Sequence, residues 1–146
     1  MATVHDVAAY ILGRRSPVTA MKLQKLVYYC QAWSLVWDEA PIFGESIEAW
    51  ANGPVVRELY ERHRGMFKVD SWEYGDANEL TASEKETVDL VLGFYGKMSS
   101  QELSNLTHQE TPWRQARKGM GSDERGSTVI SLASMHEYYS GLIELA

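Results

Sequence analysis

Apolar residues recur at spacings of three and four along most of the chain, a pattern that predicts several amphipathic helices. The first of these covers residues 4–12 and is closed by the segment Gly13-Arg-Arg-Ser-Pro17. The second follows Thr19, a suitable N-cap, and continues to Trp37. Because apolar and aromatic residues occur around most of its circumference, we expect this long helix to lie at the centre of the fold.

The regular pattern stops at Pro41 and leaves a segment with weaker signals. Residues 46–50 indicate a short extended run, which would pair at a sheet edge. Asn52-Gly53-Pro54 predicts a turn that leads into a helix, with Pro54 at the first helical position and the helix ending by Gly65. Residues 70–78 are polar, acidic and glycine-bearing, which predicts a loop.

Two capping boxes mark the starts of later helices. Thr81 with Glu84, and Ser99 with Glu102, each place a hydroxyl and a carboxylate three residues apart. In this arrangement each side chain can satisfy a free backbone N–H at the helix start. We therefore expect helices to begin at both places.

The last third of the chain carries two further helix signals. Thr111 followed by Pro112 predicts a capped, proline-initiated short helix that reaches about Arg117. A flexible loop containing Gly119, Gly121 and Gly126 should follow, and Ser131 is placed to cap a final helix.

These elements together predict a mainly α fold, a single compact helical domain over residues 1–146 with a long central helix and at most one or two short strands. A length of 146 residues with 45% apolar content suits one hydrophobic core. The formal charge of −6 disfavours a polyanion, so nucleic acid is not expected as the main partner. The single cysteine, Cys30, and the absence of a signal peptide or a long apolar run favour a cytoplasmic protein that does not enter a membrane.

The side chains that could carry chemistry do not form a recognisable catalytic set. The four histidines are scattered, and none has the spacing of a metal-binding pair on one helix face. His108 and Glu110 are the only short pairing of a histidine with a carboxylate that would merit a test. We therefore expect no catalytic residues, no cofactor, no metal and no enzymatic activity.

The aromatic residues favour a protein that binds other proteins. Five Trp and eight Tyr outnumber three Phe, and such amphipathic rings are enriched in interface hot spots. Trp33, Trp37 and Tyr95 lie on predicted core stripes, whereas Trp72 and Tyr74 in the polar loop are candidates for exposed partner contacts. A basic run provides three more candidates, which are Arg57, Arg62 and Arg64.

Three blocks of the chain resemble the signature of a known family. The blocks are residues 21–33, 47–60 (Ile-Glu-Ala-Trp-Ala-Asn-Gly-Pro-Val-Val-Arg-Glu-Leu-Tyr) and 103–113, and they look like those of the SocA-like antitoxin domain, also called the Panacea domain or phage-associated GepA-like protein. The matching positions are Leu23, Gln24, Lys25, Leu26, Tyr28, Tyr29, Trp50, Gly53, Pro54, Val55, Tyr60, Leu103, Thr107, His108, Pro112 and Trp113. Most of them look architectural, because they fall on a buried helix, a glycine-proline turn and a helix corner.

This resemblance implies a mainly helical, non-enzymatic antitoxin of a bacterial or prophage type II toxin–antitoxin pair. Such a protein neutralises a cognate protein toxin by direct binding, and one member type acts as an adaptor that delivers its toxin to a Clp-type protease. A homodimer is compatible with this class. The ending Leu145-Ala146 resembles the apolar tails that Clp-type proteases accept, although the simpler interpretation is that the last helix stops there.

The alternative function is a helix-turn-helix DNA-binding transcriptional regulator. The first two helices would form the motif, with Lys22, Gln24 and Lys25 in the first turn of the second helix as the base-reading side chains. The negative charge and the apolar circumference of that helix argue against this alternative.

Overall fold

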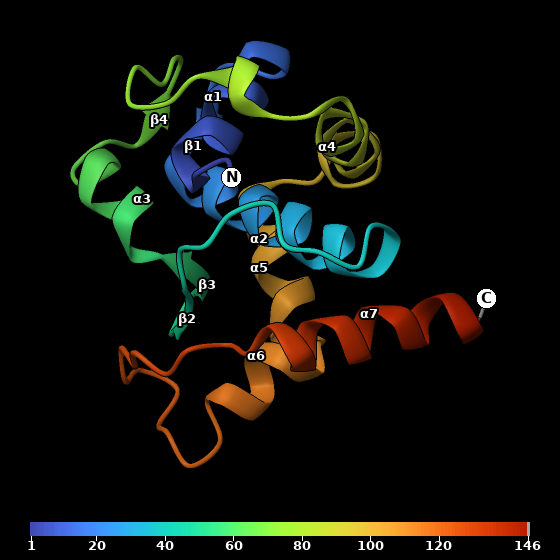
Figure 1. The fold of residues 1–146 in the computed structure, drawn as a ribbon. Coiled ribbons are helices and arrows are strands. Elements are labelled where there is room, and N and C mark those ends of the chain that lie inside the picture. Colours follow the sequence, from blue (N-terminus) through green and yellow to red (C-terminus); the bar gives the residue numbers. More distant parts are fainter. Residues whose placement is uncertain (146) are drawn as a thin grey trace.

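A computed structural model describes the backbone of residues 1–145 and the side chains of residues 1–143. Of the ending Leu145-Ala146, which resembles the tails that Clp-type proteases accept, Ala146 and the side chain of Leu145 lie outside the described part. The α-helices are α1 (Val4–Arg14), α2 (Ala20–Trp37), α3 (Arg57–His63), α4 (Ala82–Tyr95), α5 (Ser100–Gln109), α6 (Thr111–Ala116) and α7 (Leu132–Leu145). The strands are β1 (Val18–Thr19), β2 (Ile47–Trp50), β3 (Gly53–Val56) and β4 (Lys68–Val69), and a 3-10 turn, η1, covers Ala77–Glu79. The predicted mainly α class is confirmed (Figure 1).

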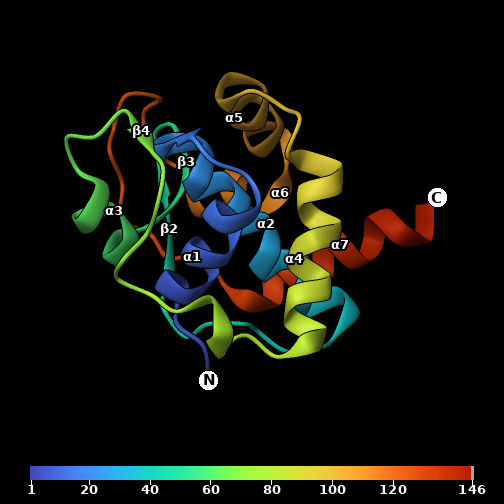
Figure 2. The ribbon, with the colours of Figure 1, turned by 90° about the horizontal axis from the view of Figure 1, so that it is seen from above.

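Helix α2 is the centre around which the other elements are arranged. Helices α1, α4, α5 and α7 all pack against it, together with strand β3. Figure 2 shows α2 enclosed between α1, α4 and α7. Leu23, Leu26 and Val27 are fully buried, as the apolar circumference of this helix predicts. No helix in the described part of the chain is long and apolar enough to span a membrane.

The helix starts follow the local capping signals. The Thr81 and Ser99 capping boxes are both formed, and the Thr19 hydroxyl accepts a hydrogen bond from the backbone N–H of Lys22. At α6 the prediction is wrong by one position, because Glu110 is the N-cap residue and Thr111 is the first helical residue. The carboxylate of Glu110 is engaged elsewhere and gives this helix no side-chain cap.

The segment that was expected to enter a helix at Pro54 is instead the second strand of a hairpin. Strands β2 and β3 pair antiparallel from Ile47 opposite Val56 to Trp50 opposite Gly53, so only the short run at 46–50 was correctly predicted as extended. Residues 53–56 form a strand because a side chain of α2 binds their backbone. The side-chain amide of Gln24 accepts from Val56 N at 2.9 Å and donates to Val56 O at 3.2 Å, so it holds this backbone as a neighbouring strand would.

Strand β2 is not an edge strand, because a later segment of the chain covers its other side. Ala49 N donates to Thr128 O, and Ile130 N donates to Ile47 O, both at 2.8 Å. The loop that leads to this contact is gathered around Arg117, whose guanidinium donates to the carbonyl oxygens of Ala49, Gly121, Glu124 and Arg125. The hairpin thus anchors the connection between α6 and α7.

Candidate interaction surface

The residues predicted to contact a partner differ in exposure, since one is buried and the others are half-buried or exposed. Trp72 was predicted to be exposed, but it is 6% exposed and its indole N–H donates to His5 Nδ1 at 3.1 Å, so that prediction is wrong. Tyr74 is 46% exposed, with the guanidinium of Arg62 4.6 Å from its ring centroid. Arg57 is held by two hydrogen bonds to Glu48, which raise its pKa. Arg64 is exposed.

The proposed base-reading side chains of a helix-turn-helix are not available to DNA. Gln24 and Lys25 are each 1% exposed, and Gln24 is committed to Val56. Lys22 Nζ donates to the carbonyl oxygen of Gly96 at 2.7 Å. The structure therefore contradicts the helix-turn-helix interpretation of this helix pair.

His108 and Glu110 do not act as a pair. The His108 ring stacks on Trp113, with ring centroids 4.0 Å apart, and its Nε2 has no hydrogen-bond partner among the described residues. The carboxylate of Glu110 faces another group of side chains, and no hydrogen bond in residues 1–143 joins it to His108. Within the described chain no three potential metal ligands lie together.

Most family-motif residues are buried and structural, as their positions suggested. None of the sixteen matching positions is exposed, and Tyr60, His108 and Trp113 are half-buried. The indole N–H of Trp113 donates to Trp50 O at 2.8 Å, and the Tyr60 ring packs edge-on against the Trp50 ring. These contacts hold the hairpin against α3 and α6.

A network of phenol groups surrounds the carboxylate of Glu110. Its Oε1 accepts from Tyr29 OH at 2.7 Å and from Tyr139 OH at 2.8 Å. Tyr139 OH also lies 3.0 Å from Tyr28 OH. Burial raises the pKa of Glu110, although the two tyrosine hydrogen bonds act in the opposite direction. A carboxylate is thus embedded in an aromatic environment, and no salt bridge joins it to a basic side chain within residues 1–143.

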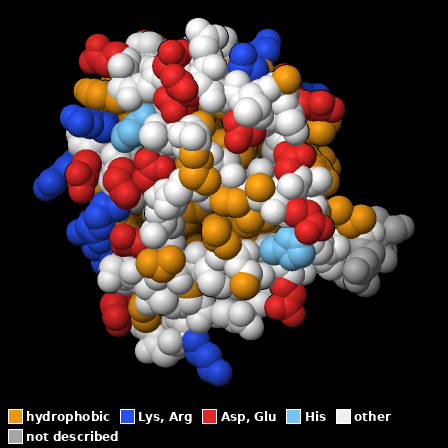
Figure 3. Space-filling view, viewed as in Figure 1, with side chains coloured by type: hydrophobic (Ala, Val, Ile, Leu, Met, Phe, Trp, Pro, Cys, Tyr) orange, Lys and Arg blue, Asp and Glu red, His pale blue; other side chains and the backbone are white. Residues whose placement is uncertain are grey.

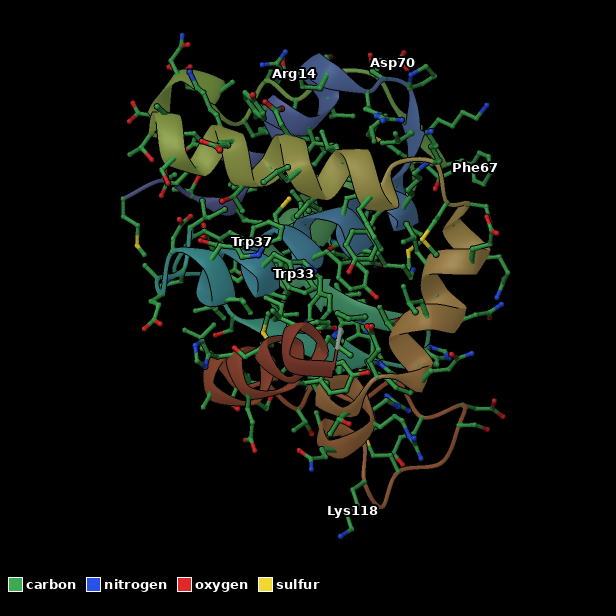
Figure 4. The ribbon with its side chains drawn as sticks, turned by 90° about the vertical axis from the view of Figure 1, so that its right-hand side faces the viewer. Arg14, Trp33, Trp37, Phe67, Asp70 and Lys118 are labelled. Atoms are coloured by element: carbon green, nitrogen blue, oxygen red, sulfur yellow. The ribbon has the colours of Figure 1, made fainter. Side chains whose placement is uncertain are left out.

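Of this network, Glu110 also lines an apolar groove of about 560 Å³. Figure 4 looks onto the groove, with α4 above, α7 below, and Trp33 and Trp37 of α2 between them. The lining residues are Trp33, Trp37, Leu90, Val91, Phe94, Tyr95, Leu106, Glu110, Leu142 and Ile143. The floor is ordered, because the Trp33 indole donates to Tyr95 OH at 2.9 Å. Burial raises the pKa of Tyr95 to about 12, so its hydroxyl stays protonated and adds no charge to the floor.

The sequence interpretation missed this groove. Trp37 was assigned to the core but is 43% exposed at the groove rim. Leu90 and Phe94 are 55% and 76% exposed, and they lie four residues apart on α4, off the predicted core stripe. An apolar pair at that spacing on the outer side of a helix is the signal that could have revealed the surface.

Comparison with known proteins assigns the chain to a family. No curated protein and no solved structure matches it. A family model described as antitoxin SocA-like, Panacea domain, matches residues 23–114, which run from α2 into α6. This match covers more than half of the chain, and the chain therefore belongs to the SocA-like, Panacea-domain antitoxin family.

Proposed function

We propose that this protein is the antitoxin of a bacterial or prophage type II toxin–antitoxin pair and neutralises a toxin encoded beside it by direct binding in the cytoplasm. The family match over residues 23–114 carries the proposal. The exposed apolar groove supports it, because a large apolar patch on a protein surface commonly marks an interaction site. We propose no enzymatic activity and no cofactor.

The test is coexpression with the product of the neighbouring gene. That product alone should stop growth, and this chain supplied in trans should restore growth and copurify with it. If the neighbouring product is harmless, or if it stays toxic in the presence of this chain, the proposed function is wrong.

Neutralisation by delivery to a Clp-type protease is a second mechanism for the same function, and a homodimer is compatible with either. The toxin's half-life separates the two mechanisms. Simple blocking leaves the half-life unchanged when the antitoxin is present, whereas an adaptor shortens it and loses its effect in cells that lack the protease.

A further inference from the structure

The groove between α4 and α7 leaves large apolar side chains uncovered. Trp37, Phe94 and Ile143 are 43%, 76% and 49% exposed, and Leu90 lies beside them. Helices α4 and α7 each pack against α2, which forms the floor between them. Two helical walls with an apolar floor are the geometry that accepts the apolar face of a third helix.

The floor also contains an acceptor with spare capacity. Glu110 is 5% exposed, and both of its tyrosine donors bind the same oxygen, Oε1. No hydrogen bond within the described part of the chain reaches its other oxygen, Oε2, and Glu110 lines the groove. A buried carboxylate is stabilised when a cation or strong donor reaches it. Because Glu110 lines the groove, a partner bound there can supply that group.

The surroundings of the groove favour a cationic partner. Helices α5 and α7, and α2 beyond Lys25, contain no Lys or Arg. Glu86 on α4 lies one turn before Leu90. On the face shown in Figure 3, basic side chains gather at the left-hand edge, with others at the top and the bottom, whereas acidic ones prevail on the right-hand part over α4 and α7. Opposite charges steer association and select partners.

We propose that this groove binds an amphipathic helix of the toxin, which buries a row of apolar side chains against Trp37, Leu90 and Phe94 and directs one Lys or Arg to Glu110. This inference rests on the proposed antitoxin function and names the surface that performs it. A small apolar ligand would occupy the floor but leave the rim side chains exposed. A second copy of the chain would bring two grooves with the same acidic surroundings together, because a twofold interface joins like surfaces.

The first test compares two phenylalanines of equal exposure. Phe94 and Phe67 are both 76% exposed, and Figure 4 shows Phe67 away from Trp33 and Trp37. The probe is the toxic product of the neighbouring gene. Phe94→Asp should abolish growth rescue and raise the dissociation constant for this product at least about 30-fold, as expected for a central interface residue. Phe67→Asp should change it less than about twofold, and both variants should show wild-type circular dichroism and melting temperature.

The second test examines the proposed contact between Glu110 and a Lys or Arg of the toxin. Glu110→Gln keeps a carbonyl oxygen for the two tyrosines and removes the charge. We expect this variant to bind the same product about tenfold more weakly than wild type does. Added salt should also weaken its binding less than it weakens that of wild type. Equal binding by wild type and Glu110→Gln would overturn the cationic contact.

The outcomes separate this inference from the proposed function. If wild type fails to neutralise the neighbouring product, the function is wrong. If wild type and Phe94→Asp neutralise it equally, the function holds and the groove assignment is wrong. A photo-crosslinking amino acid at position 94 should react with a helix of the toxin that carries a Lys or Arg. A crosslink to a strand or loop, or to a second copy of this chain, would overturn the proposal.

Discussion

Lys25 places an ammonium group in the protein core, where the side chain is 1% exposed. Its Nζ donates one long hydrogen bond, 3.4 Å, to Met21 O, and its Cε lies against Gly53. Burial lowers its pKa from 10.5 to about 8. The unfolded chain therefore binds this proton more tightly than the folded protein, so the charged lysine reduces the free energy of unfolding.

Replacing Lys25 by Met should stabilise the protein at neutral pH. A difference of one in pKa between the folded and unfolded states corresponds to about 1.4 kcal/mol, so we expect a gain of about 2–3 kcal/mol at pH 7. Above pH 10.5 the lysine is neutral in both states and costs nothing, and its penalty develops as the pH falls toward 8. The advantage of Lys25→Met should therefore shrink between pH 8 and pH 10.5.

Urea unfolding at a series of pH values measures this difference. Lys97→Met is the matched control, because Lys97 is exposed and its loss should change stability by less than about 0.5 kcal/mol. If the Lys25→Met variant is less stable than wild type at pH 7, the ammonium must have a partner that offsets its burial.

Exposure of single residues is only partly predictable from sequence. The apolar circumference of α2 predicted a central helix, and Cys30 within it is buried, with burial raising the pKa of its thiol. The predictions for Trp72 and Trp37 are both wrong, in opposite directions. The neighbours of Trp72 in sequence are polar, but its hydrogen-bond partner is His5, far away in the chain. Trp37 follows the apolar stripe, but it emerges at the rim of the groove between α4 and α7. Both outcomes depend on contacts that local patterns do not contain.

The helices could be located because their start signals are local. Thr19, Thr81 and Ser99 each cap a helix within three residues of themselves, so the sequence contains the full interaction. The β2–β3 hairpin depends instead on Gln24, which is 32 positions from Val56. A glycine-proline pair that is typical of a helix start therefore became a strand.

Gly53 gives the hairpin a backbone conformation that other residues rarely adopt. Its φ is +134°, and a Cβ there would lie 3.1 Å from Lys25 Cε. We expect Gly53→Ala to destabilise the protein by about 1–3 kcal/mol, because the backbone strain and the contact add. Thermal unfolding of the purified variant measures the effect.

Gly13 is the control for this substitution, because alanine should have the opposite effect on stability there. It lies in α1, where an added Cβ meets nothing within 4 Å, and Gly13→Ala should stabilise the protein by about 0.5–1 kcal/mol. If both alanine substitutions stabilise the protein equally, the special conformation assigned to Gly53 is wrong.

At the scale of the whole molecule, the core extends beyond the segment that defines the family. The match ends at residue 114, yet Met135 and Tyr139 of α7 are fully buried. The Tyr139 ring contacts those of Tyr28, Tyr29 and Trp33 of α2, with centroids 5.6–6.1 Å apart. Helix α7 therefore completes both the core around α2 and one wall of the groove. The sequence predicted α7 as an amphipathic helix but not where it packs. The apolar pattern of α7 does not specify which side of α2 it covers.

Tyr139→Ala tests this integration of α7. The substitution removes a buried ring and one of the two donors to Glu110, so we expect a loss of about 3–5 kcal/mol, comparable to other large aromatic deletions. Tyr138→Ala, at a half-buried neighbour on the same helix, should cost less than about 1.5 kcal/mol. Chemical unfolding followed by circular dichroism and tryptophan fluorescence should give one coincident transition for each variant, since α7 shares the core with α2. A separate early transition confined to α7, or equal costs for the two tyrosines, would mean that α7 folds against the rest as an independent, dispensable element.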